Sequence, residues 1–152
     1  MIEIADFFEH QEYPNVSGII FPDGFIQLVT VSVKWGTPPS FQVEIDEATT
    51  VETLKSKGLL TWSDGAILGK AISGDEAFEA VCGEGDFGSD GFVAVVRAET
   101  KKLTWLAAFK NSNPFKHVNF KKGCVCAEST MGTVWCFPLS DPCEFFIEPA
   151  EK

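Results

Sequence analysis

The stretch from Phe25 to Trp35, FIQLVTVSVKW, does most to limit how this chain can fold. Phe25, Val29 and Val33 lie on one side of an extended chain, whereas the other side becomes polar towards its end. This period of two, in a segment rich in β-branched residues, favours a half-buried strand over a helix. The pair Asp23-Gly24 is typical of a tight turn, so we expect residues 16–21 to form the preceding strand.

Similar short apolar segments recur along the chain, separated by Gly, Pro, Asn and Asp. Residues 75–82 fit either a helix or a strand, and we favour the strand because Phe78, Ala80 and Cys82 alternate. Asp64-Gly65 predicts a two-residue hairpin between two of the segments. In all we expect about ten short strands. Besides the two already described, we place them at residues 40–45, 59–63, 66–72, 92–98, 103–109, 115–120, 124–127, 133–137 and 144–148.

Residues 49–57 form the clearest predicted helix. Thr49 and Glu52 have the spacing of a capping box, and Gly58 fits the position just after a helix end. With one helix and many strands, we expect a mainly β or α+β fold whose antiparallel strands form a curved sheet or a sandwich. The chain has 152 residues and no repeat or linker, so we expect residues 1–152 to be one domain.

Charge and composition exclude several classes of partner. The chain has 22 acidic and 12 basic residues, a formal net charge of −10. Phosphate and anionic lipid repel such a protein, so we expect it to bind neither nucleic acid nor a membrane. The start of the chain has neither the basic residues nor the apolar stretch of a secretory signal. This predicts a cytoplasmic protein if Met1 is the native start.

The five cysteines are expected to be free and to serve packing. An odd number suits a reducing compartment, where cysteine behaves as a small apolar residue. Cys124 and Cys126 lie on one face of a strand, and with His117 nearby a zinc site is the alternative. Their spacing is not the Cys-x₂₋₄-Cys of common zinc sites, so we expect no metal there. The cysteines are Cys82, Cys124, Cys126, Cys136 and Cys143.

No segment carries a catalytic or cofactor-binding pattern. The sequence lacks the nucleophile elbow, the phosphate-binding loop and the dinucleotide fingerprint. The Gly-rich segment 84–91 resembles a calcium loop if Asp86 is the first ligand, but Gly88 and Arg97 then stand at two ligand positions. We therefore expect no enzyme, no catalytic residue, no cofactor and no metal, and we interpret residues 84–91 as a solvated turn.

The distribution of charge along the chain is the most informative functional feature. Residues 71–96 contain six acidic residues and no basic one, whereas residues 100–127 contain six lysines and no acidic residue. The acidic block could be a solvated face, or it could dock a basic partner and accelerate their encounter. The lysines could bind an anion or pair with the acidic block. The predicted partner-binding residues are Glu79, Glu84, Asp86 and Asp90, which lie in or beside the Gly-rich loop.

These features favour a non-enzymatic protein-binding module, a small acidic inhibitor that neutralises a basic partner such as a toxin. Bacterial immunity proteins share this general character, being small, acidic and single-domain, although no motif of this chain is theirs. A nuclease toxin must present a positive cleft to phosphate, and an acidic surface can occupy that cleft. The alternative is a β-sheet domain that holds an apolar small molecule in a Phe-lined cavity, since the chain has 14 Phe residues.

Overall fold

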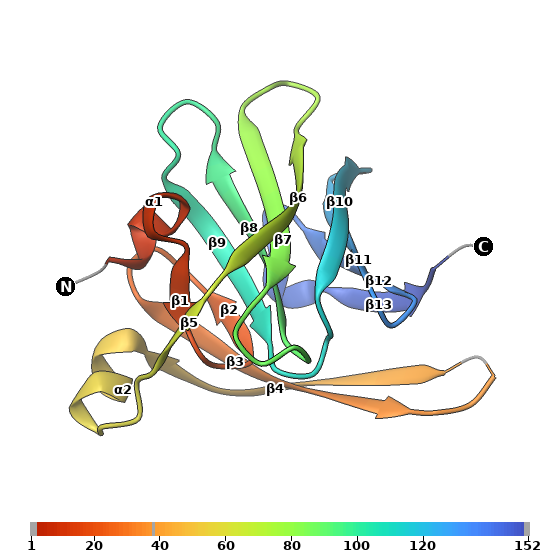
Figure 1. The fold of residues 1–152 in the computed structure, drawn as a ribbon, viewed down its shortest axis with the longest axis horizontal. Helices are drawn as coiled ribbons and strands as arrows, with labels where there is room; N and C mark the ends of the chain where they lie inside the picture. Colours follow the sequence, from red (N-terminus) through yellow and green to blue (C-terminus); the bar gives the residue numbers. More distant parts are fainter. Residues whose placement is uncertain (1–2, 38, 151–152) are drawn as a thin grey trace.

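The computed structural model describes residues 3–37 and 39–150, and its strands form three antiparallel sheets (Figure 1). The largest has the strand order β4-β3-β2-β9-β8-β7-β6, the second has the order β10-β11-β12-β13, and β1 pairs with β5. The mainly β, antiparallel fold expected from the sequence is therefore confirmed. Pro38, in the connection from β3 to β4, and Met1 lie outside the described residues.

The strands of the seven-stranded sheet are β2 (Gly18–Ile20), β3 (Phe25–Lys34), β4 (Ser40–Thr50), β6 (Ala66–Ile72), β7 (Phe78–Glu84), β8 (Gly91–Arg97) and β9 (Leu103–Phe109). The four-stranded sheet contains β10 (Phe115–Lys121), β11 (Cys124–Ser129), β12 (Thr133–Pro138) and β13 (Phe146–Pro149). The remaining elements are η1 (Ile4–Asp6), α1 (Phe7–His10), β1 (Glu12–Pro14), α2 (Val51–Ser56), β5 (Trp62–Asp64) and η2 (Pro142–Glu144). No helix in this described part of the chain is long and apolar enough to cross a membrane.

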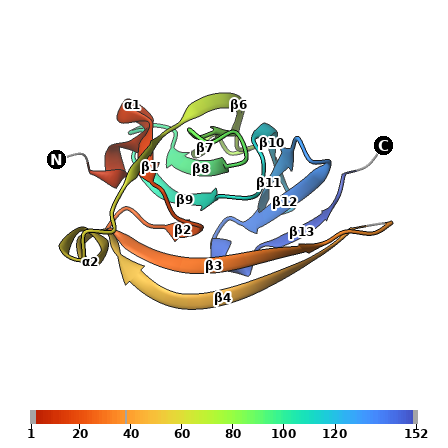
Figure 2. The same ribbon diagram turned by 60° about the horizontal axis from the view of Figure 1, so that its bottom comes forward.

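The central strands β2, β9, β8 and β7 of the seven-stranded sheet are covered on both faces, whereas β4 has no buried residue. One face packs against the four-stranded sheet through an aromatic core that includes Trp105, Phe109 and Trp135. The other face is covered by η1, α1 and β1, where the rings of Phe7 and Phe92 meet edge to face. In Figure 1, α1 and β1 lie on the opposite side of this sheet from β10–β13. Figure 2 shows how far β3 and β4 curve beneath the rest of the molecule.

The turn predicted at Asp23-Gly24 is present between β2 and β3. The Gly24 N–H donates to the Phe21 carbonyl oxygen at 2.9 Å, and the positive φ of Gly24 is one that glycine adopts without strain. The strand expected at residues 40–45 runs on to Thr50, because β4 stays paired with β3 up to the pair Phe25↔Thr50.

The hairpin predicted at Asp64-Gly65 is wrong. β5 pairs with β1 instead of β6, and the Gly65 N–H donates to the Gln11 carbonyl oxygen at 2.6 Å. β6 finds its partner in β7, farther along the chain. A turn-forming dipeptide reports only local backbone preference, and here the N-terminal segment offers the competing strand edge. That segment, with η1, α1 and β1, was not predicted.

The helix predicted at residues 49–57 is shorter, because α2 spans Val51–Ser56. Its cap is Thr50, whose side-chain oxygen accepts a hydrogen bond from the Thr53 N–H at 2.9 Å, whereas Thr49 still belongs to β4. The predicted end is confirmed. The Gly58 N–H donates to the Lys55 carbonyl oxygen, and Gly58 has a φ of +69°.

The ambiguous segment 75–82 becomes a strand from Phe78 onwards. The turn before it is closed by the side chain of Ser73, whose oxygen accepts a hydrogen bond from the Phe78 N–H at 3.0 Å. β7 continues to Glu84 and β8 begins at Gly91, so the turn predicted at residues 84–91 is reduced to residues 85–90.

A glycine inside β7 allows β6 to pair closely with it. A Cβ atom on Gly83 would lie 1.8 Å from the Ala66 carbonyl oxygen. We predict that Gly83→Ala lowers the free energy of unfolding by about 1–3 kcal/mol, because the backbones must separate. The measurement is urea unfolding followed by circular dichroism.

The matched control for this change is Gly74→Ala. Gly74 lies in the turn before β7, has no atom near its Cβ position and does not have a positive φ. Alanine there should leave stability unchanged or slightly raise it, since it restricts the unfolded chain. Equal losses in the two variants would contradict the steric explanation.

Candidate functional site

The four predicted partner-binding residues do not form one cluster. Glu79 lies near the start of β7 and Glu84 at its end. The two residues are five steps apart along the strand, which separates them by about 17 Å. Asp86 and Asp90 belong with Glu84, because the loop 85–90 directly follows β7. The structure therefore brings three of the four carboxylates to one end of the sheet.

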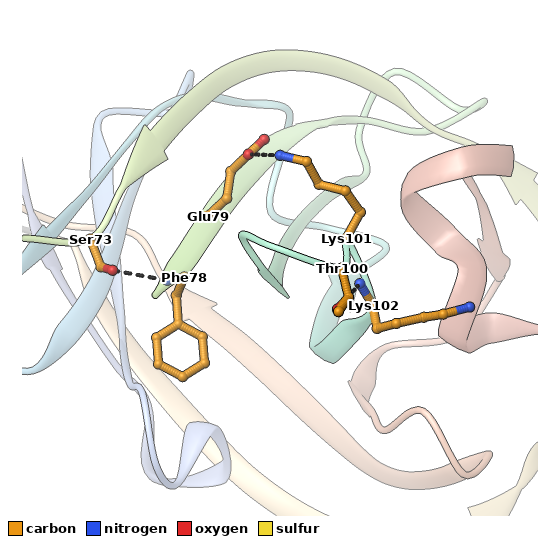
Figure 3. Close-up of polar contacts among 6 residues, drawn as sticks. All are labelled: Ser73, Phe78, Glu79, Thr100, Lys101 and Lys102. Atoms are coloured by element: carbon orange, nitrogen blue, oxygen red, sulfur yellow. Dashed lines mark hydrogen bonds and ion pairs between the residues drawn. The ribbon is translucent and has the colours of Figure 1, made fainter. Parts of the chain in front are cut away.

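Glu79 is used within the fold. Its side chain is almost buried, and its Oε2 accepts a hydrogen bond from the Lys101 Nζ at 2.6 Å (Figure 3). Lys101 reaches it from the turn between β8 and β9, and its ammonium also lies over the ring of Phe8 at 5.2 Å. A buried carboxylate with a nearby cation is a structural ion pair. Glu79 is thus not exposed to a partner.

Asp90 supports the loop from inside. It is only 4% exposed, and its Oδ1 accepts a hydrogen bond from the Phe87 N–H at 3.2 Å. A Cβ atom on Gly85 would lie within 2.3 Å of both the Asp90 carboxylate and the Tyr13 hydroxyl, so the absence of a side chain makes room for them. Burial, and then the negative charges of Asp90 and Asp86, raise the pKa of Tyr13 well above its usual value.

Two predicted residues, Glu84 and Asp86, remain available at this end of the sheet. Glu84 is half-buried and Asp86 is exposed. The Asp86 Oδ2 accepts a hydrogen bond from the Asp64 N–H at 3.2 Å, which fixes the loop against β5. Asp64 is paired in register with Glu12 of β1, so both of these carboxyl residues belong to the same end.

We call the set Glu12, Asp64, Glu84, Asp86 and Phe87 the acidic loop surface. Phe87 stands in the loop with 65% of its side chain exposed. The ion pairs of residues 3–37 and 39–150 are Lys101–Glu79, Lys102–Asp6 and Lys116–Glu128. None of them includes a carboxylate of the acidic loop surface, so its negative charge is not compensated by any of these three ion pairs.

Sequence reasoning missed Glu12, Asp64 and Phe87. Glu12 and Asp64 are far apart in the chain and meet only because β1 pairs with β5. The dipeptide Asp64-Gly65 predicted a hairpin turn, so the pairing of β5 with β1 was not expected. The exposure of Phe87 could have been inferred from its position between Asp86 and Gly88, because a Gly-rich acidic turn offers no buried place for a ring.

The lysine block is spread over several elements. Lys101 pairs with the acidic block, whereas Lys102 pairs with Asp6 of η1 and Lys116 pairs with Glu128 of β11. Of the two roles expected for these lysines, pairing with the acidic block is found for Lys101, whereas the partners of Lys102 and Lys116 lie outside that block. The interaction between the acidic and basic blocks is the Lys101–Glu79 pair alone among the ion pairs of the described residues.

The cysteines do not assemble into the zinc alternative. Cys82 lies in β7, where burial raises the pKa of its thiol to about 12, and Cys143 lies in η2. Cys126 and Cys136 face each other across β11 and β12. Within the part of the chain that the structure describes, no three His, Cys, Asp or Glu side chains are placed to hold a metal ion.

The phenylalanine-rich interior is filled by its own rings. Phe109 contacts Trp135, Phe137 and Phe145 with centroid distances of 4.6, 6.1 and 5.3 Å. Phe115 meets Trp135 edge to face. These contacts occupy the space between the two large sheets.

Removing the lysine of the partly buried Lys101–Glu79 ion pair tests the structural role of Glu79. We predict that Lys101→Met lowers the free energy of unfolding by about 1–3 kcal/mol, because a nearly buried carboxylate loses its charged partner. Lys116→Met is the control, since its pair with Glu128 is exposed at 3.4 Å and should contribute about 0–1 kcal/mol. Both values come from urea unfolding.

The double variant Glu79→Gln/Lys101→Met separates charge from packing. It removes the unpaired carboxylate and should recover part of the stability that Lys101→Met loses. The comparison is with the stability that Glu79→Gln loses on its own. If the double variant is less stable than Lys101→Met by that full amount, the two side chains are not coupled.

Alkaline titration reports directly on Tyr13, the only tyrosine of the chain. Because the pKa of Tyr13 is raised in the folded protein, its hydroxyl stays protonated there, whereas in the unfolded chain it loses its proton at about pH 10. The contribution of this pKa difference to the free energy of unfolding is fully present below about pH 10 and is lost progressively as the pH rises above it. We predict that tyrosinate absorbance appears together with the loss of β-sheet circular dichroism. A folded protein that ionises near pH 10 would contradict this.

On the acidic loop surface, carboxylates that take part in none of the three ion pairs occur together with the exposed ring of Phe87. The sequence matches no known protein-family model and no curated protein.

Proposed function

We propose that the protein is a non-enzymatic binding module that neutralises a basic protein partner, such as a toxin domain, as small acidic immunity proteins do. The observation that carries the proposal is the acidic loop surface. It combines carboxylates that have no ion pair within the described chain with one exposed aromatic ring. Charge of one sign accelerates the encounter with a basic protein and disfavours wrong partners.

The exposed Phe87 ring would add binding affinity that the carboxylates alone do not provide. Exposed carboxylates contribute modestly to affinity because water solvates them well, whereas a buried aromatic ring at the centre of an interface often dominates binding. Glu84 at the end of β7 and Asp86 in the loop precede Phe87 and would surround its contact with polar groups. A basic surface with an apolar pocket is the partner that fits this arrangement.

The loop is held in place before any partner binds. The Asp90 carboxylate accepts a hydrogen bond from the Phe87 N–H, and the Asp86 carboxylate accepts one from the Asp64 N–H. The Asn113 N–H donates to the Ser89 carbonyl oxygen at 2.8 Å. A fixed loop loses little conformational entropy when it binds, which favours affinity.

The proposed contact is therefore narrower than the sequence predicted. Glu84 and Asp86 meet the partner, and Glu79 and Asp90 act indirectly by supporting β7 and the loop. The same proposal places the protein in the bacterial cytoplasm and excludes nucleic acid as its partner. Its support is five unpaired cysteines, which suit a reducing compartment, and the net charge of −10.

The test compares two double variants that remove the same charge. Glu84→Gln/Asp86→Asn should weaken binding to the basic protein that co-purifies with the wild type by about 2 kcal/mol or more at low salt. Glu44→Gln/Glu99→Gln changes exposed carboxylates elsewhere and should have little effect. Titration calorimetry at low and high salt measures both. Neither variant should alter the melting temperature, because these charges are exposed or half-exposed.

Phe87→Ser distinguishes docking at the loop from a general charge effect. It should weaken the complex at both salt concentrations and leave the fold intact, since the ring is largely exposed. Wild-type affinity in Glu84→Gln/Asp86→Asn and in Phe87→Ser would place the interface elsewhere. Equal weakening in the two double variants would show that net charge, not this surface, drives binding.

A further inference from the structure

The outer face of the four-stranded sheet carries thiols where packing does not require them. The inner face of β11 and β12 supplies Val125, Ala127, Trp135 and Phe137 to the aromatic core. Cys124, Cys126 and Cys136 occupy the alternate positions of the same strands, so they lie on the opposite face. Burial in the core between the sheets therefore does not account for them.

Two of these thiols are placed directly opposite each other. Cys126 of β11 and Cys136 of β12 are partners in the antiparallel register. Direct partners have Cα atoms about 4.5–5.5 Å apart and side chains on the same face. A disulfide needs Cα atoms about 4.4–6.8 Å apart, so the backbone already meets the requirement.

The remaining cysteines fit less well. Cys124 is paired with Pro138, and its diagonal relation to Cys136 places their Cα atoms about 7–8 Å apart, beyond the range of an unstrained bridge. Cys82 lies in the seven-stranded sheet and Cys143 lies in η2. The pair Cys126–Cys136 is the one in direct register among the cysteines, all of which are free and lie in the described residues.

The two thiols differ in their exposure to solvent, so they should react in a defined order. Both border a hollow of the outer face that His117, Lys121 and Glu148 also line. Cys126 is half-buried there, whereas Cys136 is 3% exposed. Burial, and then the adjacent Cys126 thiol, raise the pKa of Cys136. Cys136 thus stays protonated and protected until a neighbouring sulfur becomes electrophilic.

We propose that Cys126 and Cys136 form a reversible intramolecular disulfide by exchange with a low-molecular-weight disulfide such as glutathione disulfide. The Cys126 thiolate attacks one sulfur, the disulfide bond of the reagent breaks, and one glutathione thiolate leaves. Cys136 then loses its proton to water and attacks the Cys126 sulfur, which releases the second glutathione. Two protein thiols are oxidised, one glutathione disulfide is reduced to two glutathione molecules, and a thiol reductant reverses the reaction.

The bridge would join β11 and β12 covalently across their turn. Both strands contribute to the aromatic core through Ala127 and Trp135. A covalent link reduces the freedom of the unfolded chain, so the oxidised protein should be more stable than the reduced protein. The change would be confined to the four-stranded sheet, because no atom of β7 or β8 takes part.

The experiment exposes the fully reduced, full-length protein to glutathione disulfide and follows its intact mass. The wild type should lose about 2 Da, the mass of two hydrogens, and two of its five titratable thiols. Peptide mapping should place the bridge between Cys126 and Cys136. The melting temperature should rise and return to its starting value after reduction.

Single substitutions test the order of the two attacks. Cys136→Ser should stop at a mixed disulfide, with one glutathionyl group added at Cys126. Cys126→Ser should acquire neither the bridge nor that adduct, and Cys124→Ser is the matched control that should behave as the wild type does. Serine is close to cysteine in size, and circular dichroism confirms that each variant is folded.

Any of three results in the wild type would overturn the proposal. The first is a stable glutathione adduct at Cys126 without loss of the second thiol. The second is a bridge mapped to Cys124 or to any cysteine outside this pair. The third is an unchanged mass at an oxidant concentration that oxidises a model dithiol peptide.

Discussion

Burial of the central strands β2, β9, β8 and β7 of the seven-stranded sheet on both faces is the constraint on which the rest of the structure depends. β8 shows it most clearly, because its residues from Gly91 to Val96 are buried and its apolar run does not alternate. One face needs the aromatic layer of the four-stranded sheet, and the other needs η1, α1 and β1. The charged residues of the central strands β7 and β8 consequently lie at or near the strand ends, where the Glu79–Lys101 pair and the loop 85–90 are found.

Sequence reasoning located most strands because period-two alternation and turn residues are local properties of the chain. It identified the Asp23-Gly24 turn and the end of α2 at Gly58, where a positive φ favours glycine. It failed at Asp64-Gly65, because the choice of partner strand depends on where residues 12–14 lie in space. The helix cap is Thr50 and not Thr49, because β4 continues to Thr50 and α2 begins only after it.

The candidate site was predictable as a charged block but not as a surface. Sequence gives the number of carboxylates between residues 71 and 96, yet burial decides what each one does. Glu79 and Asp90 became internal partners of Lys101 and of the Phe87 N–H, whereas Glu84 and Asp86 stayed accessible. An exposed carboxylate and a buried one look identical in a charge pattern, because the distinction arises from neighbours that lie far away in the chain.

The loop 85–90 also depends on the four-stranded sheet, through the connection between β9 and β10. A Cβ atom on Gly91 would lie 2.4 Å from the Asn113 carbonyl oxygen, so glycine lets this connection approach the start of β8. There the Asn113 N–H donates to Ser89, and the Ser129 hydroxyl at the end of β11 donates to the Ser112 carbonyl oxygen. The geometry of the acidic loop surface therefore rests on contacts that only the packed sandwich provides. A partial unfolding that separated the sheets would release the loop together with the aromatic core, since the same connection joins both.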